Sequence, residues 1–379
     1  MFTTLQQALE FLTYQKNNPH YNTLHIEAAL QVLGNPQHSF KSVHITGTNG
    51  KGSVTRMIYQ VLREAGYSVW VFLSPHLLDV RERFIVDDEW IDDQSLIEIE
   101  NKIAHLGLPL SRFEKYVTTA FLYFQLKKVD FAVIEVWVWA RHDATNVLNP
   151  EVSVITNLWL DHPKTLGVTI DEIAYHKWAI IKPWKPVVVG VLHPFFEKEA
   201  QEKGSELIFS QREIPTNMIG NFQKNNAGIA YDVCRVLWID EKTILWWLQK
   251  VRHKGRLDYV LPNLLVDGAH NSDGLVQLKE YISTVRWNFE NVYLCFSLKK
   301  TRAVTRITDI FWKDENFIIV DYFQDILEPL ESLQSQMKAL GIRVSTYSPE
   351  IIWEKAKKEP RHLYVVFGSL YMIGQFLRD

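Results

Sequence analysis

The stretch His44-Ile45-Thr46-Gly47-Thr48-Asn49-Gly50-Lys51-Gly52-Ser53 decides how the rest of the chain is interpreted. An apolar run of the β type, Val43 to Thr46, leads into a glycine-rich turn, and a helical pattern follows from Val54 to Ala65. Glycines let backbone N–H groups curl around an anion without Cβ clashes. The amides at the start of the helix and the charge of Lys51 add attraction for phosphate. We therefore predict that residues 47–53 hold a polyphosphate.

The loop departs from the common GxxxxGK[ST] spacing. Position 45 is isoleucine where that pattern has glycine, and Gly52 separates Lys51 from Ser53. A purely structural glycine turn is the alternative reading. The order strand, turn, lysine, hydroxyl and helix favours a phosphate loop, while the unusual spacing argues against a P-loop kinase or motor protein.

Composition indicates a globular protein without a strong charge bias. The chain has 379 residues, enough for two domains or three, with 47% hydrophobic and 22% charged residues. A net charge of −3 gives no electrostatic argument for binding nucleic acid or an acidic membrane. No stretch resembles a signal peptide or reaches the roughly 20 apolar residues of a membrane span. Cys234 and Cys295 lie in apolar runs, so we expect buried free thiols and a cytoplasmic protein.

Apolar runs alternate with helical patterns, which predicts an α/β fold with mostly parallel sheets. We expect an N-terminal P-loop-type domain, residues 1–255, with helices on both faces of its sheet, and a smaller Rossmann-like domain, residues 256–379. The predicted strands are 43–46, 67–73, 131–136, 152–160 and 185–192, then 264–266, 291–297, 316–320 and 363–367. The predicted helices include 93–106, 112–127, 223–237 and 241–251, then 303–312, 329–340, 349–357 and 370–377.

Reactive side chains recur where the predicted strands end. In open α/β sheets, ligands bind beyond the carboxyl ends of the strands. Taken singly, each residue has a structural reading, such as a turn cap, an ion-pair partner or a surface loop residue. Together they favour a site where Mg²⁺ bridges phosphates. The residues are Lys51, Ser53, Ser74, His76, Glu135, Asp161, His162, Asp267 and His270.

An ordered series of motifs gives the chain a family resemblance. It resembles the folylpolyglutamate synthase/dihydrofolate synthase family of the Mur ligase superfamily over nearly its whole length. GTNGKGS followed by SPHL, DATNV and DGAHN in this order is highly specific. The motifs are HITGTNGKGS (44–53), SPHLLDVRERF (74–84), VIEV and DATNV (133–147), LDH (160–162), HK and IIKP (176–183), GNFQKNNAGIA (220–230), GRLD (255–258), DGAHNSDG (267–274) and GSLY (368–371).

The resemblance implies an ATP-dependent ligase of folate biosynthesis and one-carbon metabolism. A folate or dihydropteroate carboxylate would attack ATP to form an acyl phosphate, and the amine of L-glutamate would then form the amide. ATP and Mg²⁺ are the implied cofactors, and a monomer is the family expectation. Two alternatives stay open: a nucleotide-binding pseudoenzyme of the same fold, and a Mur-like amide ligase acting on another carboxylate acceptor.

The resemblance also implies roles for individual residues. The folate site would lie near residues 74–84. Lys177 matches a family lysine that is carbamylated and helps to hold a second metal, with a monovalent cation as a further candidate; spacing alone would make it a solvated lysine. The nucleotide-binding residues are Gly47, Thr48, Asn49, Gly50, Lys51, Gly52, Ser53, Asn226, Arg256 and Asp267; the metal ligands are Ser74, Glu135, His162 and Lys177; the catalytic residues are Lys51, Lys177, His162, Asp267 and His270.

Tryptophan replaces glycine at several matched positions. The chain has 13 Trp against 17 Gly, although glycine alone normally makes up about 7% of a protein. Indoles cannot reproduce the positive φ or the close approach that glycine permits. The fold accommodates them by outward rotation, or the protein has lost activity, or the sequence carries systematic substitutions. The affected positions are Trp70, Trp137, Trp139, Ala140, Trp159 and Trp184, with Trp178 and Ala179 replacing Ala and Gly.

Overall fold

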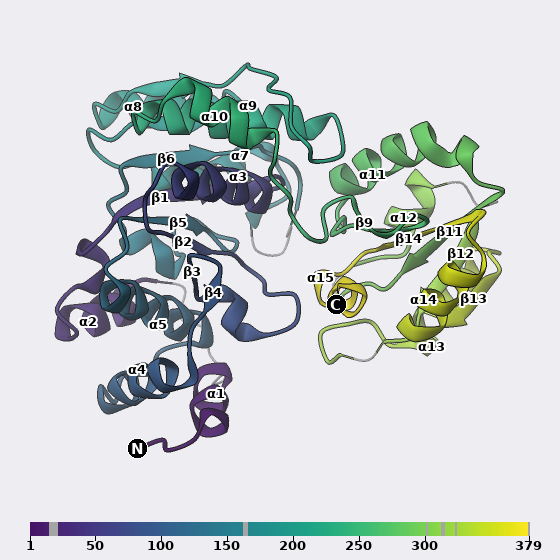
Figure 1. Ribbon diagram of the computed structural model, residues 1–379, viewed down its shortest axis with the longest axis horizontal. Coiled ribbons are helices and arrows are strands. Elements are labelled where there is room, and N and C mark those ends of the chain that lie inside the picture. The colour runs from purple at the N-terminus through teal and green to yellow at the C-terminus, as the bar shows by residue number, and fades with distance from the viewer. Residues whose placement is uncertain (15–21, 162–165, 301, 312–314, 323, 378–379) are drawn as a thin grey trace. The chain divides into compact units, whose positions relative to one another are not determined.

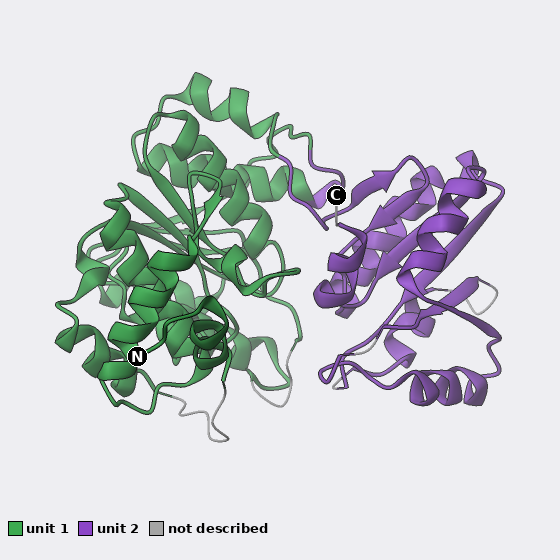
Figure 2. Ribbon diagram, turned by 60° about the horizontal axis from the view of Figure 1, so that its bottom comes forward, with its two compact units in different colours: residues 1–217, 223–251 green, residues 218–222, 252–379 purple. Residues whose placement is uncertain are grey.

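The computed structural model describes residues 1–379 except 15–21, 162–165, 301, 312–314, 323 and 378–379 (Figure 1). It divides into two compact units (Figure 2). Unit 1 consists of residues 1–217 and 223–251, and unit 2 of residues 218–222 and 252–379. The division expected from sequence, at 255/256, did not include the short excursion of residues 218–222 into unit 2.

The sheet of unit 1 has the strand order β4-β3-β2-β5-β1-β6-β7-β8. The neighbours from β2 to β8 pair in parallel, whereas β3 pairs antiparallel with both β2 and β4. All but the first residue of β1 are buried, as expected for a central strand covered on both faces. The strands are β1 Lys41–Thr46, β2 Val69–Phe72, β3 Ile85–Val86, β4 Glu89–Trp90, β5 Phe131–Glu135, β6 Val152–Ile155, β7 Val187–Val189 and β8 Leu207–Phe209.

The helices of unit 1 begin at polar caps that satisfy their first N–H groups. Ser111 and Glu114 form a capping box at the start of α5, and Thr169 and Glu172 form one at α7. Helix α3 begins at Lys51, three residues before the predicted start, so its first turn is part of the glycine-rich loop. The helices are α1 Leu5–Thr13, α2 Leu24–Val32, α3 Lys51–Glu64, α4 Asp93–His105, α5 Arg112–Lys127, α7 Ile170–Lys177, α8 Pro194–Glu202, α9 Phe222–Val236 and α10 Glu241–Leu248.

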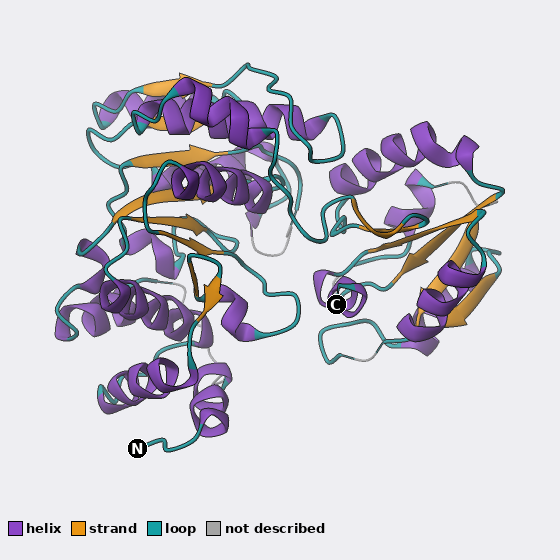
Figure 3. Ribbon diagram, viewed as in Figure 1, coloured by secondary structure: helices purple, strands orange, loops and turns teal. Residues whose placement is uncertain are grey.

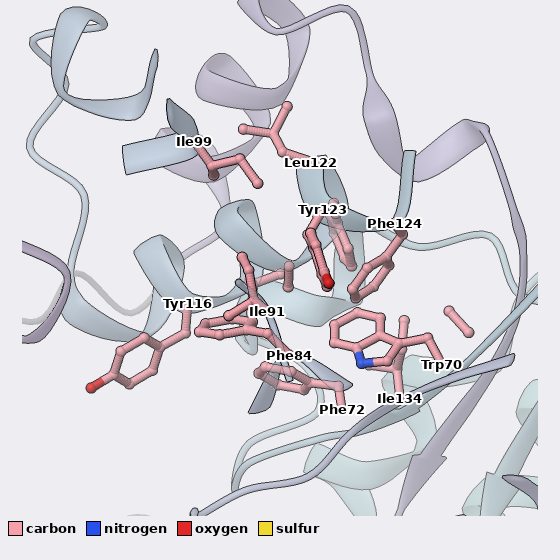
Figure 4. Close-up of a cluster of buried hydrophobic side chains, with 14 of the residues drawn as sticks. Trp70, Phe72, Phe84, Ile91, Ile99, Tyr116, Leu122, Tyr123, Phe124 and Ile134 are labelled. Atoms are coloured by element: carbon pink, nitrogen blue, oxygen red, sulfur yellow. The ribbon is translucent and has the colours of Figure 1, made fainter. Parts of the chain in front are cut away.

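A large aromatic cluster fills the space between the sheet and helices α4 and α5 (Figure 4). Phe121 and Phe124 come from α5, and Trp70 and Phe72 come from β2. Trp70 is fully buried in this cluster. The edge of the sheet that carries β2 is therefore held by side-chain packing rather than by further parallel strands.

Unit 2 contains a six-stranded sheet of order β13-β12-β11-β14-β10-β9 (Figure 3). Its strands are parallel except β9, which pairs antiparallel with β10. The strands are β9 Asp258–Leu261, β10 Leu264–Val266, β11 Asn291–Phe296, β12 Asn316–Val320, β13 Val344–Tyr347 and β14 His362–Phe367. The helices are α11 Ser272–Val285, α12 Thr305–Ile310, α13 Leu330–Ala339, α14 Pro349–Lys358 and α15 Leu370–Ile373.

The fold class is confirmed as α/β with two mostly parallel sheets, and individual elements differ from expectation. The predicted strand 152–160 ends at Ile155, because the backbone beyond it turns to bind the glycine-rich loop. The predicted helix 370–377 is α15 followed by a 3₁₀ turn, Gly374–Phe376. Strands β8, β9 and β13 and the β3–β4 hairpin were not predicted. Cys234 and Cys295 are buried free thiols, as predicted.

No helix within the described parts of the chain is both long and apolar enough to cross a membrane.

We predict that Asn263→Ala destabilises unit 2. The Asn263 side chain is buried, and its amide donates to the carbonyls of Ala356, Glu359 and His362 over 2.9, 3.1 and 2.9 Å. Its removal leaves carbonyls without their donor, which costs ~2–3 kcal/mol. Urea unfolding followed by tryptophan fluorescence measures the loss. Asn291→Ala, at an exposed strand start, is the matched control, and an equal loss in both would contradict the assignment.

Candidate nucleotide and metal site

The glycine-rich loop between β1 and α3 depends on two glycines. Gly47 has φ +148°, and a Cβ there would stand 1.8 Å from Thr156 Oγ1. Gly50 has φ +80°, and a Cβ there would stand 2.6 Å from Asn226 Oδ1. At both positions the backbone angle is unfavourable for other residues, and neighbouring atoms occupy the space that a Cβ would need. Only glycine satisfies both conditions, so the loop can lie directly against its neighbours.

Residues after β6 hold the loop through its backbone. Thr156 Oγ1 donates to the carbonyl of Asn49 over 2.6 Å, and the N–H of Asn49 donates to Asn157 Oδ1 over 2.8 Å. The N–H of Thr48 donates to the carbonyl of Asn157 over 3.2 Å. The backbone N–H and carbonyl of Trp159 both bond to the Thr48 hydroxyl, at 3.1 Å each. These bonds tie the loop to the segment that follows β6.

Lys51 lies over this loop. Its Nζ donates to the carbonyls of Gly47 and Thr48 over 3.1 and 3.0 Å. The same Nζ lies 4.0 Å from Glu135 Oε1. A cation at the start of helix α3, beside backbone carbonyls that a phosphate oxygen can replace as partners, suits the binding of an anionic ligand.

Glu135 and Ser74 present oxygen atoms beside Lys51. Glu135 is buried at the end of β5, and its Oε2 accepts a long 3.4 Å bond from the N–H of Ser74. The Ser74 hydroxyl is buried and has no hydrogen-bond partner among the described residues. Orphaned buried oxygens are costly unless a ligand completes them. A carboxylate and a hydroxyl fit Mg²⁺, which prefers oxygen ligands and keeps several waters.

The other predicted metal ligands are Lys177 and His162. Lys177 is buried at the end of α7, where its Nζ donates to the Gly47 carbonyl over 2.8 Å. Burial lowers the pKa of Lys177 well below its usual value, and the nearby charge of Lys51 adds to this effect. The neutral amine is the form that reacts with carbon dioxide. His162 lies outside the described residues, and no group of three His, Cys, Asp or Glu side chains with metal-site geometry occurs within them.

Asn226 also belongs to this group. It is buried on α9, and its Nδ2 donates to Gln223 Oε1 over 2.9 Å. Gln223 in turn donates from Nε2 to the Ser53 hydroxyl over 3.3 Å. Helix α9 therefore contacts the loop at Ser53, whereas Thr156 contacts it at Asn49. The structure thus places Lys177 against the loop, Glu135 beside Lys51, and Asn226 beside the partner of Ser53. His76 lies instead in the turn of residues 74–84, bonded to Arg83.

Arg256, Asp267 and His270 form a second group, within unit 2. Asp267 follows β10, and its two carboxylate oxygens accept from the N–H groups of Leu257 and Ala269, each over 2.7 Å. Burial raises the pKa of Asp267, and the adjacent Arg256 guanidinium opposes this rise. A Cβ on Gly268 would stand 1.8 Å from Arg256 Nη1, so glycine is required for the arginine to lie there. His270 Nδ1 is 2.7 Å from the Gly268 carbonyl.

The segment expected to meet folate, residues 74–84, is a compact turn. Glu82 accepts from the N–H groups of Leu77, Leu78 and Asp79 over 2.6–2.8 Å. Arg83 donates from Nε to His76 Nδ1 over 3.0 Å. Burial, with the Arg83 charge nearby, lowers the pKa of His76 to about 4. His76 therefore stays neutral at physiological pH and accepts this bond.

The indoles near the site have different environments. Trp137 and Trp159 are 45% and 49% exposed, so much of each side chain is rotated outward. Trp139 packs against His142 and His176, and Trp178 against the Arg141 guanidinium, 4.4 Å from its ring centre. The sequence-based expectation that an indole excludes positive φ fails at Trp184, where φ is +56°. Ala140, also at a matched glycine position, has φ +46°.

Sequence reasoning did not single out a buried polar chain beneath the site. His44 Nε2 lies 2.8 Å from the Thr145 hydroxyl, which donates to Asp143 Oδ1 over 2.6 Å. Asp143 Oδ2 accepts from the N–H of Trp137, two residues after Glu135. Asp143 thus fixes the backbone that follows a predicted metal ligand. The DATNV motif contained both Asp143 and Thr145, but only the fold places His44 against them.

Comparisons with known proteins agree with this arrangement. Residues 45–245 match the Mur ligase middle domain. The chain is 30% identical to the dihydrofolate synthase/folylpolyglutamate synthase of Bacillus subtilis over 399 residues, covering 90% of this chain and 91% of that protein. It is 33% identical to the folylpolyglutamate synthase of Lacticaseibacillus casei over 298 residues, covering 65% and 68%.

The chain belongs to the folylpolyglutamate synthase/dihydrofolate synthase family of Mur ligases. Members of this family are ATP-dependent ligases, and this is the enzyme class of the chain. Two solved structures share its fold. The folylpolyglutamate synthase of Thermotoga maritima has a TM-score of 0.82 at 27% identity, covering 98% of this chain and 95% of that one. An FPGS–AMPPCP–folate complex has a TM-score of 0.83 at 25% identity, with complete coverage of both chains.

We predict that Gly50→Ala weakens ADP binding by about tenfold or more, ~1.4 kcal/mol. The added methyl would stand 2.6 Å from Asn226 Oδ1, so the loop must shift. Isothermal titration calorimetry measures the affinity. Gly66→Ala is the control, because Gly66 has a similar φ of +94° and no described atom lies within 4 Å of its Cβ position. An equal effect of both variants on ADP binding would contradict a local role for Gly50.

Proposed function

We propose that this chain ligates L-glutamate to a folate carboxylate at the expense of ATP, and that dihydropteroate is a second acceptor. The observation that carries the proposal is the grouping of the phosphate loop, Lys51, Glu135 and the orphaned Ser74 hydroxyl at one sheet edge. Family membership supports the same reaction, since the relatives are named for it.

The reaction has two steps. A carboxylate oxygen of the acceptor attacks the γ-phosphorus of ATP, which gives an acyl phosphate and releases ADP. The amine nitrogen of glutamate then attacks the acyl carbon, inorganic phosphate leaves, and the amine loses a proton. Phosphoryl transfer of this kind depends on positioning and charge neutralisation more than on covalent chemistry by the protein.

Residues of unit 1 would position the phosphates. Residues 47–53 would bind phosphate oxygens through backbone N–H groups other than those of Thr48 and Asn49, which are donated to Asn157, and Lys51 would exchange its carbonyl partners for phosphate oxygens. Ser74, Glu135 and His162 would hold Mg²⁺, which when bound neutralises phosphate charge. The neutral amine of Lys177 is suited to carbamylation, which would turn it into an anionic ligand for a second cation, divalent or monovalent.

Unit 2 would supply the remaining groups. We propose that residues 1–255 form the ATP-binding domain and residues 256–379 the glutamate-ligase-type domain. Arg256 would contact the nucleotide, Asp267 would stabilise the Arg256 guanidinium by its charge, and His270 would act on the reacting groups. Asp267 supports this arrangement because its oxygens also accept from the N–H groups of Leu257 and Ala269, which directly follow Arg256 and Gly268.

The setting of the reaction follows from its substrates. Folates, ATP and L-glutamate are small molecules of the cytoplasm, where we propose that the protein acts. We expect a monomer that binds neither nucleic acid nor membrane, in keeping with its net charge of −3.

A second candidate is a nucleotide-binding pseudoenzyme of the same fold. The partly buried indoles of Trp139 and Trp178, which flank His176 and Lys177, favour it. ATP binding without ligation under any folate would be its signature. Phosphate release measured with folate, dihydropteroate and other carboxylates, each with and without glutamate, tests both candidates and the acceptor class. Release that is independent of acceptor and glutamate would contradict the proposed ligase.

We predict that Lys51→Ala lowers kcat by roughly 10²–10³-fold, because a preorganised charge at the transferred phosphate is lost. Thermal stability should change by less than about 3 °C, since the two carbonyls that Lys51 serves can bind water instead. Glutamate-dependent phosphate release and a melting curve measure the two effects. Lys185→Ala, which removes a surface ion pair with Glu151, is the control. A large drop in melting temperature for Lys51→Ala would show that the lysine is chiefly structural.

We predict that the double substitution Trp137→Gly and Trp139→Gly raises kcat. Both indoles follow Glu135 within four residues, so their removal frees the backbone there to adapt to bound phosphate. The same assay measures the gain. Trp287→Gly, at a position 85% exposed in unit 2, should leave kcat unchanged. An unaltered rate in the double variant would mean that the outward rotation of the indoles already clears the site.

A further inference from the structure

Two exposed tryptophans have a left-handed backbone. Trp184 has φ +56° and is 83% exposed, and Trp238 has φ +62° and is 93% exposed. Positive φ brings Cβ against a backbone carbonyl oxygen, so a bulky residue there is a genuine outlier. Neither indole is buried deeply enough for packing to compensate this strain.

Trp184 occupies a turn position that demands glycine. The N–H of Lys185 donates to the carbonyl of Lys182 over 3.2 Å, which closes a four-residue turn with Pro183 and Trp184 at its centre. Proline second and a residue of positive φ third is the signature of a type II turn, in which the third residue is normally glycine.

Trp238 occupies a helix-end position that also demands glycine. Helix α9 ends at Val236, and the N–H of Trp238 donates to the carbonyl of Arg235 over 3.0 Å. The N–H of Ile239 donates to the carbonyl of Cys234 over 3.0 Å. This pair of bonds is the Schellman motif, in which the left-handed residue is usually glycine.

Trp70 does not have a positive φ, but its side chain lacks space. Its ring centre lies 2.8 Å from that of Phe124, whereas aromatic pairs normally lie 4.5–7 Å apart (Figure 4). Its indole Nε1 is buried without a partner in the described part of the chain. The two side chains compete for one volume in an otherwise closely packed cluster.

We propose that residues 70, 184 and 238 are glycine in the protein as its own cells make it. The reason is that those cells translate as glycine a codon that is written as tryptophan in the sequence. This single cause explains the positive φ of Trp184 in a turn and of Trp238 at a helix end, and the overfilled core around Trp70. It also explains why the sequence has 13 Trp against 17 Gly. The inference rests on backbone angles and packing, so it is independent of the proposed function.

The proposal extends to the nucleotide site. Trp137, Trp139 and Trp159 stand where the family motifs carry glycine, and each lies close to Glu135 or to the loop that Thr48 belongs to. With glycine at these positions, no side chain would cover the backbone at the strand ends around the phosphate loop. The pseudoenzyme candidate then loses Trp139, one of the two indoles that favour it, and keeps Trp178.

Peptide mass spectrometry of the protein purified from its own cells tests the proposal. Trypsin releases residues 236–242, whose single Trp in the sequence is Trp238, and residues 178–198, which include Trp184. We expect each mass to correspond to glycine at these two positions. The peptide 344–355 is the internal standard, because Trp353 lies within helix α14 without positive φ and should keep its indole. Tryptophan at 184 or 238 overturns the proposal.

Recombinant protein with the printed sequence tests the backbone argument separately. Trp184→Gly and Trp238→Gly should raise the melting temperature by roughly 2–4 °C each relative to Trp184→Ala and Trp238→Ala, because alanine removes the indole but keeps Cβ. Alanine variants as stable as the glycine variants would overturn the claim that these backbone positions demand glycine.

A second inference comes from an independent observation, the fully buried amide of Gln223. Its Nε2 donates to Ser53 Oγ and its Oε1 accepts from Asn226 Nδ2, over 3.3 and 2.9 Å. Because Ser53 accepts from Gln223, its own proton is directed elsewhere. We infer that Gln223 is a positioning residue that turns the Ser53 hydroxyl proton toward a bound phosphate, a role that rests on the proposed function.

Gln223→Glu tests this inference, because the substitution keeps the shape and reverses the bond. An ionised carboxylate accepts from Ser53, so the hydroxyl would present its lone pairs to the phosphate. We expect ADP affinity at pH 8 to fall by about tenfold. Affinity should recover in Gln223→Glu as the pH falls to 6, because a protonated carboxyl can again donate, while wild-type affinity stays nearly constant.

The outcomes distinguish a failure of the proposed function from a failure of the proposed role of Gln223. Wild-type protein that fails to bind ADP would contradict the proposed function itself. Wild-type binding with an unaltered or pH-independent affinity in Gln223→Glu would overturn the role of Gln223 alone. Gln336→Glu, a partly buried glutamine in helix α13 of unit 2, is the control and should bind ADP as the wild type does.

Discussion

The candidate nucleotide site depends on the close approach of the Gly47 backbone to Thr156. A single methyl group at Gly47 would stand 1.8 Å from the threonine hydroxyl, so the two segments cannot meet unless that position lacks a side chain. The same hydroxyl donates to the Asn49 carbonyl, and the next residue binds the loop through its backbone and side chain. The shape of the glycine-rich loop therefore depends on these contacts with Thr156 and Asn157.

Sequence patterns predicted much of this architecture because its central strands are long apolar runs. Residues 131–136 and 363–367 were correctly predicted to form strands, because strands buried on both faces are continuous apolar runs. The pattern failed where tertiary bonds override it. Residues 156–160 are apolar enough for a strand, yet Thr156 and Asn157 leave the sheet to bind the loop. Strand β13 is short and only half-buried, so its periodicity is weak.

The site was predicted residue by residue from motifs, and the structure adds the groups that hold those residues. The glycine-rich loop and Glu135 were expected from the residue pattern, whereas Asn226 and Lys177 were assigned their roles only through the family resemblance. The supporting groups, such as Gln223 and the chain from His44 through Thr145 to Asp143, act through geometry that a linear pattern does not contain. Burial of Lys177 lowers the pKa of its amine, which favours the neutral form.

The path of the chain between the two units limits how the protein can be dissected. The chain leaves unit 1 after residue 217, returns at residue 223 and leaves again after residue 251. Ile219 and Phe222 pack with Leu257 in the hydrophobic core of unit 2. A fragment that starts at residue 252 would lack these two side chains and expose the surface they cover. Unit 2 is thus not encoded by one continuous segment, and its transfer as a folded module requires residues 218–222, which lie between two segments of unit 1 in the sequence.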